Sequence, residues 1–398
     1  MWAALILAVG IALVAAMPGP TGNPGPSSSD QAAHDAAVAA AVVATVGSGA
    51  AGSGAADDAL VDTPPPAVDP SPTPSPSPVP SPSDPMPVPT PAAATPAPTP
   101  TPTPTPTITP PPRPALVDRA VPSSVLASLG SVFADKPQPY YDGCHVSMGG
   151  RMPNKPCLYG HLSSHTTIAI YGDSHALAWF PAVLRMVNDR GWRLLEVTMS
   201  ACIPADVIPY YPTTHSVMTA CVNFRKAALA KLAHYHPTVI LVTGTRGFET
   251  ISSSGRVLTG AARTTAWVNG MKRTLNKLIP LTSRVVMLAD TPVSRYRSPT
   301  TCIRAHPSSE RACATPVIHA VNYTWLNTEY HVALAKHVAF IDAERWVCPT
   351  SPCPLVRGNF VVYRNAGHLT ARYSGTMWKK MESAVLTILT EPRAVIGP

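Results

Sequence analysis

The chain has 398 residues, 48 of them proline, and a formal net charge of +8. Its Lys and Arg residues are scattered, with no basic run and no interleaving with aromatic residues, which argues against a nucleic-acid-binding protein. A basic surface that faces anionic polymers of a cell envelope is the better interpretation. Most prolines precede residue 115, and a stretch of that composition cannot fold alone, which leaves one globular domain of roughly 280 residues.

Residues 1–17 are expected to form a signal peptide or a membrane anchor. The run from Trp2 to Ala16 is apolar and uncharged, and its length fits a signal-peptide core better than a full membrane span. No Lys or Arg precedes the run, so the end of a longer membrane helix, its beginning missing from this reading frame, stays an alternative. Both interpretations predict that the folded domain lies outside the cytoplasm, secreted or anchored.

Two segments without a fold of their own are expected next. Residues 18–62 are rich in Ala, Gly and Ser and are predicted to be disordered. Residues 63–114 repeat Pro-Thr, Pro-Ser and Pro-Ala, and such a sequence favours a semi-rigid polyproline II spacer. About 50 residues at roughly 3.1 Å each reach on the order of 150 Å. This linker is therefore interpreted as a tether.

Residues 115–398 alternate between short apolar runs and amphipathic stretches. The expected strands are 167–171, 193–197, 238–242, 284–289 and 338–341. The expected helices are 175–190, 218–234, 262–278, 317–336 and 371–389. This alternation predicts an α/β fold, a three-layer α/β/α sandwich with a mostly five-stranded parallel sheet. The active site of such a sheet lies at the carboxyl ends of its strands.

Eight cysteines fall within the same region as four sequential pairs. The pairs are Cys144 and Cys157, Cys202 and Cys221, Cys302 and Cys313, and Cys348 and Cys353. Short local spacings in an even set favour disulfides formed in an oxidising compartment. A zinc site is the alternative, for which only Cys348 and Cys353 have a near-suitable spacing, without a second pair or a histidine in register. Spacing alone leaves the connectivity open.

Ser174 is the candidate nucleophile, because the segment Gly172-Asp173-Ser174-His175 directly follows the first expected strand. At the start of a helix, free N–H groups and the helix dipole favour a developing oxyanion. The simpler interpretation of Ser174 is a helix N-cap. The candidate base is His368, which precedes the closing helix and can reach the same sheet edge. His175 is a poorer candidate, since adjacent residues on a helix point about 100° apart.

Taken together these motifs resemble the SGNH (GDSL-type) hydrolase superfamily, and most of all the SGNH domains fused behind integral-membrane O-acyltransferases of bacterial envelopes. The resemblance runs from about Cys144 to the C-terminus and is carried by Gly172-Asp173-Ser174-His175-Ala176, Ser200-Ala201-Cys202-Ile203-Pro204, Asp290-Thr291-Pro292, the last two cysteine pairs, and Tyr363-Arg364 with His368-Leu369-Thr370. It implies a flavodoxin-like fold, Ser174 as the nucleophile and His368 as the base. It also implies an oxyanion hole made by the Ser174 N–H, with backbone near Ala201 and a group near Gly244 and Thr245 as further donors.

Two positions depart from the pattern of the superfamily. After the third strand, where an Asn is frequent, the chain has Thr243-Gly244-Thr245-Arg246, so Arg246 could replace that donor or bind substrate. Three residues before His368, where an Asp is expected, the chain has Asn365. An Asn can orient the imidazole through its oxygen but carries no charge. Asp290 and Asp342, each just after a strand, could supply charge from another direction.

These expectations point to ester chemistry on a glycan, by a Ser-His acyl-enzyme mechanism that needs neither a cofactor nor a metal. The resemblance implies that acetyl groups of envelope or secreted glycans are transferred or removed, and hydrolysis and transfer share every residue named. A separate membrane acyltransferase that supplies acyl groups is the expected partner, unless the chain begins upstream. The alternative function is a non-catalytic glycan-binding or scaffold module, in which Asn365 marks decay of the triad.

Overall fold

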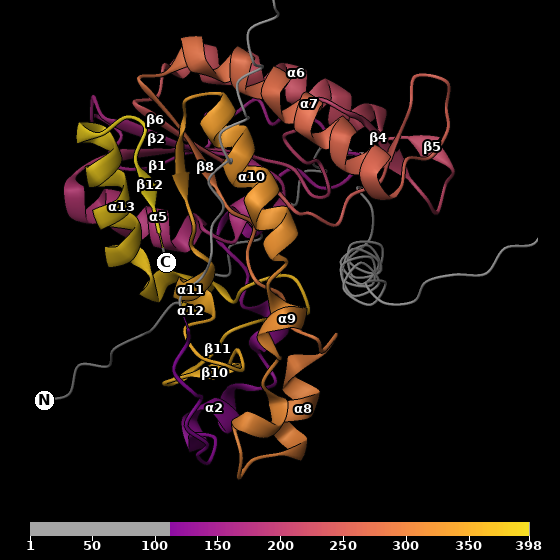
Figure 1. Cartoon of the computed structure of the whole chain (residues 1–398). Helices are drawn as coiled ribbons and strands as arrows, with labels where there is room; N and C mark the ends of the chain where they lie inside the picture. Colours follow the sequence, from indigo (N-terminus) through magenta and orange to yellow (C-terminus); the bar gives the residue numbers. More distant parts are fainter. Residues whose placement is uncertain (1–111, 398) are drawn as a thin grey trace, which may run out of the picture. The chain divides into compact units, whose positions relative to one another are not determined.

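The computed structural model describes residues 112–397 (Figure 1). The predictions for residues 1–17 and 18–62, and nearly all of that for 63–114, lie outside the described residues. Contacts with the folded domain begin at Arg113, whose guanidinium lies 2.6 Å from the Glu344 carboxylate and 2.5 Å from the Tyr323 hydroxyl. The described chain is therefore held against the domain from Arg113 onward.

The five expected strands are present and form the centre of one sheet. They are β2 (Thr167–Gly172), β3 (Arg193–Thr198), β6 (Val239–Thr243), β8 (Arg284–Leu288) and β9 (Ala339–Ile341). All five are parallel, in the order β3-β2-β6-β8-β9, which is a doubly wound arrangement. The predicted α/β fold with a mostly parallel sheet is thus confirmed.

The sheet has seven strands rather than five, because a short strand lies at each edge. β1 (Leu158–Gly160) pairs antiparallel with β3, and β12 (Val395–Ile396) pairs parallel with β9. Two small sheets lie outside it. They are the hairpin β10 (Val356–Arg357) with β11 (Phe360–Val361), and β4 (Ile208–Tyr211) with β5 (Ser216–Val217) and β7 (Thr250–Ile251). Strands of two to four residues, partly exposed, lack the apolar run that reveals a strand in a sequence.

Helices cover both faces of the sheet, as Figure 1 shows. α5 (Phe180–Arg190) and α13 (Trp378–Thr390) pack together on one face. The other face carries α6 (Thr219–Tyr235), α7 (Gly260–Leu278) and α10 (Tyr323–Ala335). The remaining short helices are α2 (Ser123–Ser128), α3 (Pro139–Asp142), α8 (Pro299–Ala305) and α11 (Glu344–Val347), with single 3₁₀ turns at Val132–Ala134, Ile279–Leu281 and Arg311–Cys313.

Three of the predicted helices are broken into two. The first divides into α4 (Ser174–Leu177) and α5, which begins at Phe180 and has Pro181 in its first turn, where proline is tolerated. The fourth divides into α9 (Val317–Ala320) and α10, because the Asn322 side chain accepts a hydrogen bond from Trp325 N–H at 3.0 Å and starts a new helix. The last divides at Met377 into α12 (Ala371–Thr376) and α13.

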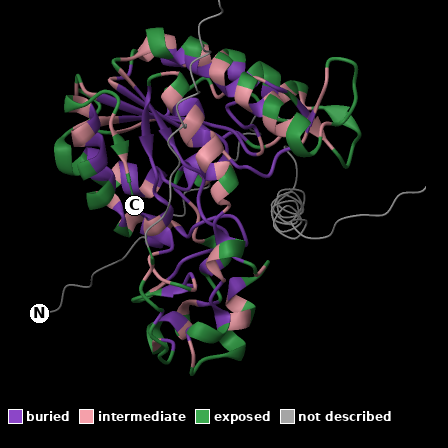
Figure 2. Ribbon diagram, in the orientation of Figure 1, coloured by how far each residue is buried: buried purple, intermediate pink, exposed green. Residues whose placement is uncertain are grey.

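The core lies on both sides of the sheet and follows the alternation of each strand. In β2, Ile168 and Ile170 pack under α5 and α13, while Ala169 and Tyr171 pack under α6 and α7. The whole strand is buried, as the purple sheet in Figure 2 shows. Each fully buried Ile or Leu contributes roughly 1.5–3 kcal/mol to folding. This packing fixes the carboxyl end of β2, from which the candidate nucleophile follows.

All eight cysteines form disulfides in the four sequential pairs. Cys348 and Cys353 bond to each other, so their sulfurs are not the thiolates that a zinc site needs. Within residues 112–397, no helix combines the length and the apolar character that crossing a membrane requires.

The chain reverses its winding direction between β2 and β6. From β2 it crosses to β3 on one side, and from β3 it returns past β2 to β6 on the other. A crevice at such a switch point, outside the carboxyl ends of the strands, is where open α/β sheets bind their ligands. The segments that leave β2 and β6 at this end begin with Asp173 and Gly244.

Candidate active site

The turn from β2 into α4 carries Ser174 and is built around Gly172 and Asp173. Gly172 has φ +152°, and a Cβ at this position would lie 1.9 Å from the Thr243 carbonyl oxygen, so no larger residue fits. The Asp173 carboxylate accepts hydrogen bonds from His175 N–H and from Thr245 N–H, both at 2.8 Å. It is fully buried, and burial raises its pKa. Asp173 therefore ties the turn to the loop that follows β6.

Ser174 meets His368 across this edge of the sheet. The Ser174 Oγ lies 2.8 Å from the His368 Nε2, and the side chains are buried, with exposures of 7% and 2%. His368 lies in the loop between β11 and α12, 194 residues along the chain from Ser174. The structure thus brings together the nucleophile and the base that the sequence predicts.

Asn365 shapes the loop that holds His368. Its Oδ1 lies 3.2 Å from the Gly367 N–H, 2.9 Å from the His368 N–H and 3.0 Å from the His368 Nδ1. Because two backbone N–H groups donate to this atom, it is an oxygen, and the His368 Nδ1 that also contacts it carries a proton. The lone pair of the imidazole is then on Nε2, which faces Ser174. Asn365 thus makes the hydrogen bond to the Nδ1 of His368 that an Asp was expected to make, without the charge.

The sequence proposes backbone near Ser174, Ala201, Gly244 and Thr245 as oxyanion donors. The Thr245 N–H donates to Asp173, which removes it from this set. The amides of Ser174, Ala201 and Gly244 donate no hydrogen bond within residues 112–397. Ala201 has φ +58°, a left-handed conformation that is uncommon outside glycine. α4 has only one turn, so the N–H groups themselves, rather than a helix dipole, are what this site offers to an oxyanion.

A buried polar chain that the sequence does not reveal supports the loop with Ala201. The His145 ring contacts the Thr198 hydroxyl at 2.6 Å and the Ser200 hydroxyl at 2.8 Å, and Thr198 donates to Glu196. Burial lowers the pKa of His145 to about 3, so this ring is neutral at ordinary pH. Burial also raises the pKa of Glu196 to about 7. Ser200, at one end of this series of hydrogen bonds, directly precedes Ala201, the candidate oxyanion donor.

The position of Glu196 makes stability depend on pH. Its folded-state pKa of about 7 exceeds the ordinary 4.5, so its contribution is present below pH 4.5 and is lost as the pH rises through 7. At 1.36 kcal/mol per pKa unit, the difference between 4.5 and about 7 corresponds to a loss of about 3 kcal/mol, most of it between pH 5 and pH 8. In the natural chain we expect the free energy of unfolding, measured in urea, to fall between pH 5 and pH 8. In Glu196→Gln, which has no carboxyl group to ionise, we expect this fall to be smaller by that amount. Equal falls in Glu196→Gln and in the natural chain would contradict this, and the exposed Glu391→Gln is the matched control.

A second buried pair lies directly behind the first. The His175 Nδ1 contacts the Asp290 carboxylate at 2.6 Å, and both side chains are only 1% exposed. The His175 ring is edge-on to the His368 ring, with centroids 5.0 Å apart, and its Nε2 lies 3.3 Å from where a Cβ on Gly367 would be. As expected, His175 does not reach Ser174. It instead supports the loop that carries His368.

Charged groups around this second pair shift the pKa values of His175 and Asp290. Burial lowers the pKa of His175, but the Asp290 and Asp173 carboxylates outweigh burial and raise it. Burial raises the pKa of Asp290, but His175 and Arg246 outweigh it and the pKa is lowered. Glu329 accepts a hydrogen bond from the Asp290 N–H at 3.4 Å, and burial places the pKa of Glu329 well above its ordinary value. Each partner thus shifts the pKa of the other toward its charged form.

Arg246 and Asp342 contact buried groups around the site rather than His368. The Arg246 N–H donates to Asp290 at 3.0 Å, and its guanidinium donates to the Ala320 carbonyl at 3.2 Å and lies 3.9 Å from Asp290. This side chain is 7% exposed and is engaged in the buried network. Asp342 accepts a hydrogen bond from the Glu344 N–H at 3.1 Å, and Asp290 bonds to His175, so neither carboxylate orients His368.

Comparisons with known proteins agree with this architecture. A family model described as SGNH domain (fused to AT3 domains) matches residues 143–380. No curated protein matches the chain. Among solved structures, the periplasmic domain of a lipopolysaccharide acetyltransferase of Salmonella ser. Paratyphi A is 15% identical, with a TM-score of 0.46 over 66% of this chain and 99% of that one. A GDSL-like lipase of Bacteroides thetaiotaomicron is 10% identical, with a TM-score of 0.30 over 57% of this chain and 88% of that one.

Proposed function

Because the chain belongs to the family of SGNH domains that are fused to AT3 domains, we propose that Ser174, His368 and Asn365 form its catalytic centre. As a member of this family it is an ester hydrolase or O-acyltransferase. The observation that supports these three residues best is the contact of 2.8 Å between the Ser174 Oγ and the His368 Nε2, with the tautomer of His368 set by Asn365. We propose further that the esters are acyl esters, acetyl above all, of glycans outside the cytoplasm.

In the first half-reaction Ser174 becomes acylated. Its Oγ attacks the ester carbonyl carbon while its proton passes to the His368 Nε2. The oxyanion of the tetrahedral intermediate accepts hydrogen bonds from the Ser174 N–H and from the amide of Ala201, with that of Gly244 as the third donor. The intermediate collapses, the bond from the carbonyl carbon to the alcohol oxygen breaks, and the alcohol leaves with the proton from the His368 Nε2.

In the second half-reaction the acyl group leaves Ser174. Water or a sugar hydroxyl loses its proton to the His368 Nε2 as its oxygen attacks the acyl-enzyme. The ester or the acid then departs, and Ser174 takes the proton back. Throughout, Asn365 accepts the Nδ1–H, so the ring presents the same face to Ser174. Hydrolysis and transfer differ only in which acceptor enters.

The partner and the location of the protein complete this proposal. Four disulfides within residues 112–397 suit an oxidising compartment, which supports a domain outside the cytoplasm. The family description names fusion to AT3 domains, which supports a membrane acyltransferase as the source of acyl groups. In this proposal residues 1–17 direct or anchor the chain at the membrane, and the spacer of residues 63–114 is the tether.

We also propose a positioning role for the His175–Asp290 pair. The His175 ring fills the space beside Gly367, so it limits how far the loop from Asn365 to His368 can move. Asp290 fixes the ring of His175, and Arg246 fixes Asp290. Preorganised geometry of this kind is what keeps a base within reach of its nucleophile.

A non-catalytic glycan-binding module is the competing function. The uncharged Asn365 favours it, whereas the intact contact between Ser174 and His368 favours catalysis. A decayed site has no reason to keep a serine and a histidine within 2.8 Å of each other in a buried position.

Labelling by a fluorophosphonate probe tests the catalytic proposal. We expect the full chain, purified with its disulfides oxidised, to be labelled at Ser174, and Ser174→Ala to show none of this labelling. The matched control is Ser383→Ala, which removes an exposed hydroxyl from α13. Absence of Ser174-dependent labelling, in both the natural chain and Asn365→Asp, would overturn the enzyme proposal in favour of the binding module.

A further inference from the structure

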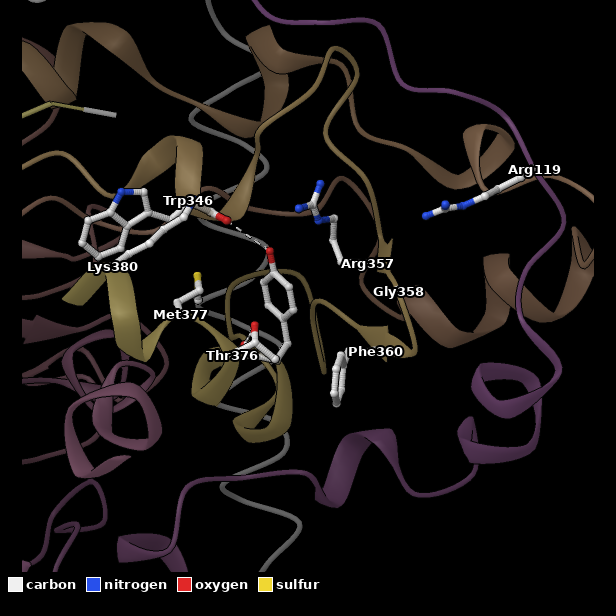
Figure 3. Close-up of a pocket in the computed structure, with 9 residues that line it drawn as sticks. Arg119, Trp346, Arg357, Gly358, Phe360, Thr376, Met377 and Lys380 are labelled. Atoms are coloured by element: carbon white, nitrogen blue, oxygen red, sulfur yellow. Dashed lines mark hydrogen bonds between the residues drawn. The ribbon is translucent and has the colours of Figure 1, made fainter. Parts of the chain in front are cut away.

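A cavity of about 460 Å³ opens among the β10–β11 hairpin, α11, α12 and the start of α13 (Figure 3). Its size lies in the range of small-ligand sites. Three of its lining residues are aromatic, Trp346, Phe360 and Tyr373, and three are cationic, Arg119, Arg357 and Lys380. We call it the cationic pocket. The residues that line it do not include Ser174, His368 or Asn365.

No acidic residue lines the cationic pocket. Arg357 and Lys380 form no ion pair within residues 112–397. Partial burial lowers the pKa of Lys380, and the positive charge of Arg357 lowers it further. Arg119 pairs with Glu310 at 3.1 Å, yet its side chain is 60% exposed and keeps N–H groups for another partner. An anion bound between these cations would relieve their repulsion.

The aromatic residues add an apolar wall to this charged rim. Tyr373 and Trp346 are buried, at 3% and 6% exposure, and the Tyr373 hydroxyl donates to the Trp346 carbonyl at 3.2 Å, which fixes their relative positions. Phe360 is half-buried on β11. Rigid aromatic surfaces pack well against the C–H face of a ring, and guanidinium and ammonium groups bind carboxylate and phosphate. A ring that carries an anionic group satisfies both halves of the pocket.

The cationic pocket shares its supporting segments with the catalytic pair. Tyr373 lies five residues after His368, in the helix that this loop enters. The Trp346 ring packs edge-on against the ring of Trp179, which lies five residues after Ser174, with centroids 6.0 Å apart. Two residues that line the pocket are thus linked to the segments that carry Ser174 and His368, one by ring packing and one along the chain.

We propose that the cationic pocket binds an anionic sugar residue, one whose ring bears a carboxylate or a phosphate, as part of the glycan on which the protein acts. This inference rests on the glycan substrate of the proposed function. Phe360, the partly exposed aromatic residue of the pocket, receives the sugar ring beside the buried Trp346 and Tyr373, and Arg357 and Lys380, with Arg119, receive the negative charge. The pocket thereby selects charged glycans.

Calorimetric titration of the full-length Ser174→Ala chain tests this proposal without requiring turnover. The probes are tri-galacturonate and its fully methyl-esterified form, which differ only in charge. We expect tri-galacturonate to bind, and Arg357→Gln and Lys380→Gln each to weaken binding at least 10-fold. Both residues are exposed, so the variants keep the fold. Phe360→Ala should weaken binding to a similar extent, since the aromatic wall is part of the site.

The controls separate this site from general attraction to a basic protein. Lys226→Gln removes an exposed cation from α6, on the other face of the sheet, and should leave binding unchanged. Sulfate and inorganic phosphate report whether the anion alone suffices, and poly-glutamate reports whether any polyanion does. Equal binding of the methyl ester, equal loss in Lys226→Gln, or tighter binding of poly-glutamate than of tri-galacturonate would overturn the proposal. So would the absence of binding by tri-galacturonate and by a phosphorylated sugar such as glucose 6-phosphate. Labelling of Ser174 is measured separately, so the two proposals can fail independently.

Discussion

The Asn365→Asp variant should hydrolyse an aryl acetate about 10² to 10⁴ times faster than the natural chain. In the serine proteases the opposite change, from Asp to Asn, lowers kcat by about 10⁴. Here the Oδ1 already receives the His368 Nδ1–H and two backbone N–H groups, so the replacement keeps the loop and adds only charge. That charge stabilises the imidazolium that forms when Ser174 loses its proton. The Nδ2 of Asn365, buried and without a hydrogen-bond partner among the described residues, marks where the second carboxylate oxygen would lie.

Steady-state rates across pH check this expectation. The acidic limb of the profile of kcat/KM against pH should move to higher pH in Asn365→Asp, because a carboxylate favours the protonated imidazole. The exposed Asn188→Asp is the matched control, and it should leave both the rate and the profile unchanged. A flat or falling kcat in Asn365→Asp would contradict the argument, and would mean that Asn365 is adapted to this site.

Asp290→Asn should lower the free energy of unfolding by about 3–5 kcal/mol, because it leaves His175 buried without its carboxylate. The deficit should depend on pH in a defined direction. The pKa of His175 is raised in the folded state, so the contribution of the pair is present at pH 6 and is lost as the pH rises through that pKa. The difference in unfolding free energy between the two chains should therefore be larger at pH 6 than at pH 9. Urea unfolding of the full chains at both pH values measures it.

The double variant His175→Gln with Asp290→Asn distinguishes a coupled pair from two independent contacts. It should lose less stability than the sum of the single variants, because neither partner is then left alone. The positioning role also predicts a lower kcat with little change in KM for Asp290→Asn, and recovery of kcat in Asp290→Glu. Additive losses, or a kcat equal to that of the natural chain, would show that the pair does not act on His368.

The contact between Ser174 and His368 can be predicted from the sequence for a physical reason. Ser174 follows a fully buried apolar strand and His368 precedes the closing helix, and parallel strands bring such positions to one edge of the sheet. The five central strands can be predicted likewise, because each is a short apolar run that is covered by helices on both faces of the sheet. The roles of the residues at this edge stay predictions until the probe and the variants test them.

The buried side-chain contacts that support the site cannot be predicted from the sequence in the same way. His175 and Asp290 are 115 residues apart, and their contact depends on how far the segment after β8 turns toward α4. The chain of His145, Thr198 and Glu196 likewise joins residues whose side-chain directions no local pattern encodes. Helix breaks are missed because the apolar spacing continues across them, while a cap such as Asn322 decides the boundary. Tertiary context determines these details.

The order of the disulfides has a consequence for how the domain can mature. Each cysteine pairs with the next one along the chain, over 13, 19, 11 and 5 residues, so no loop encloses or crosses another. A chain that is threaded through an export channel from its N-terminus presents each pair completely before the next pair emerges. Oxidation in the order of emergence then yields the final connectivity directly, without thiol–disulfide exchange. Such a domain can be oxidised during translocation and needs no isomerase to correct it.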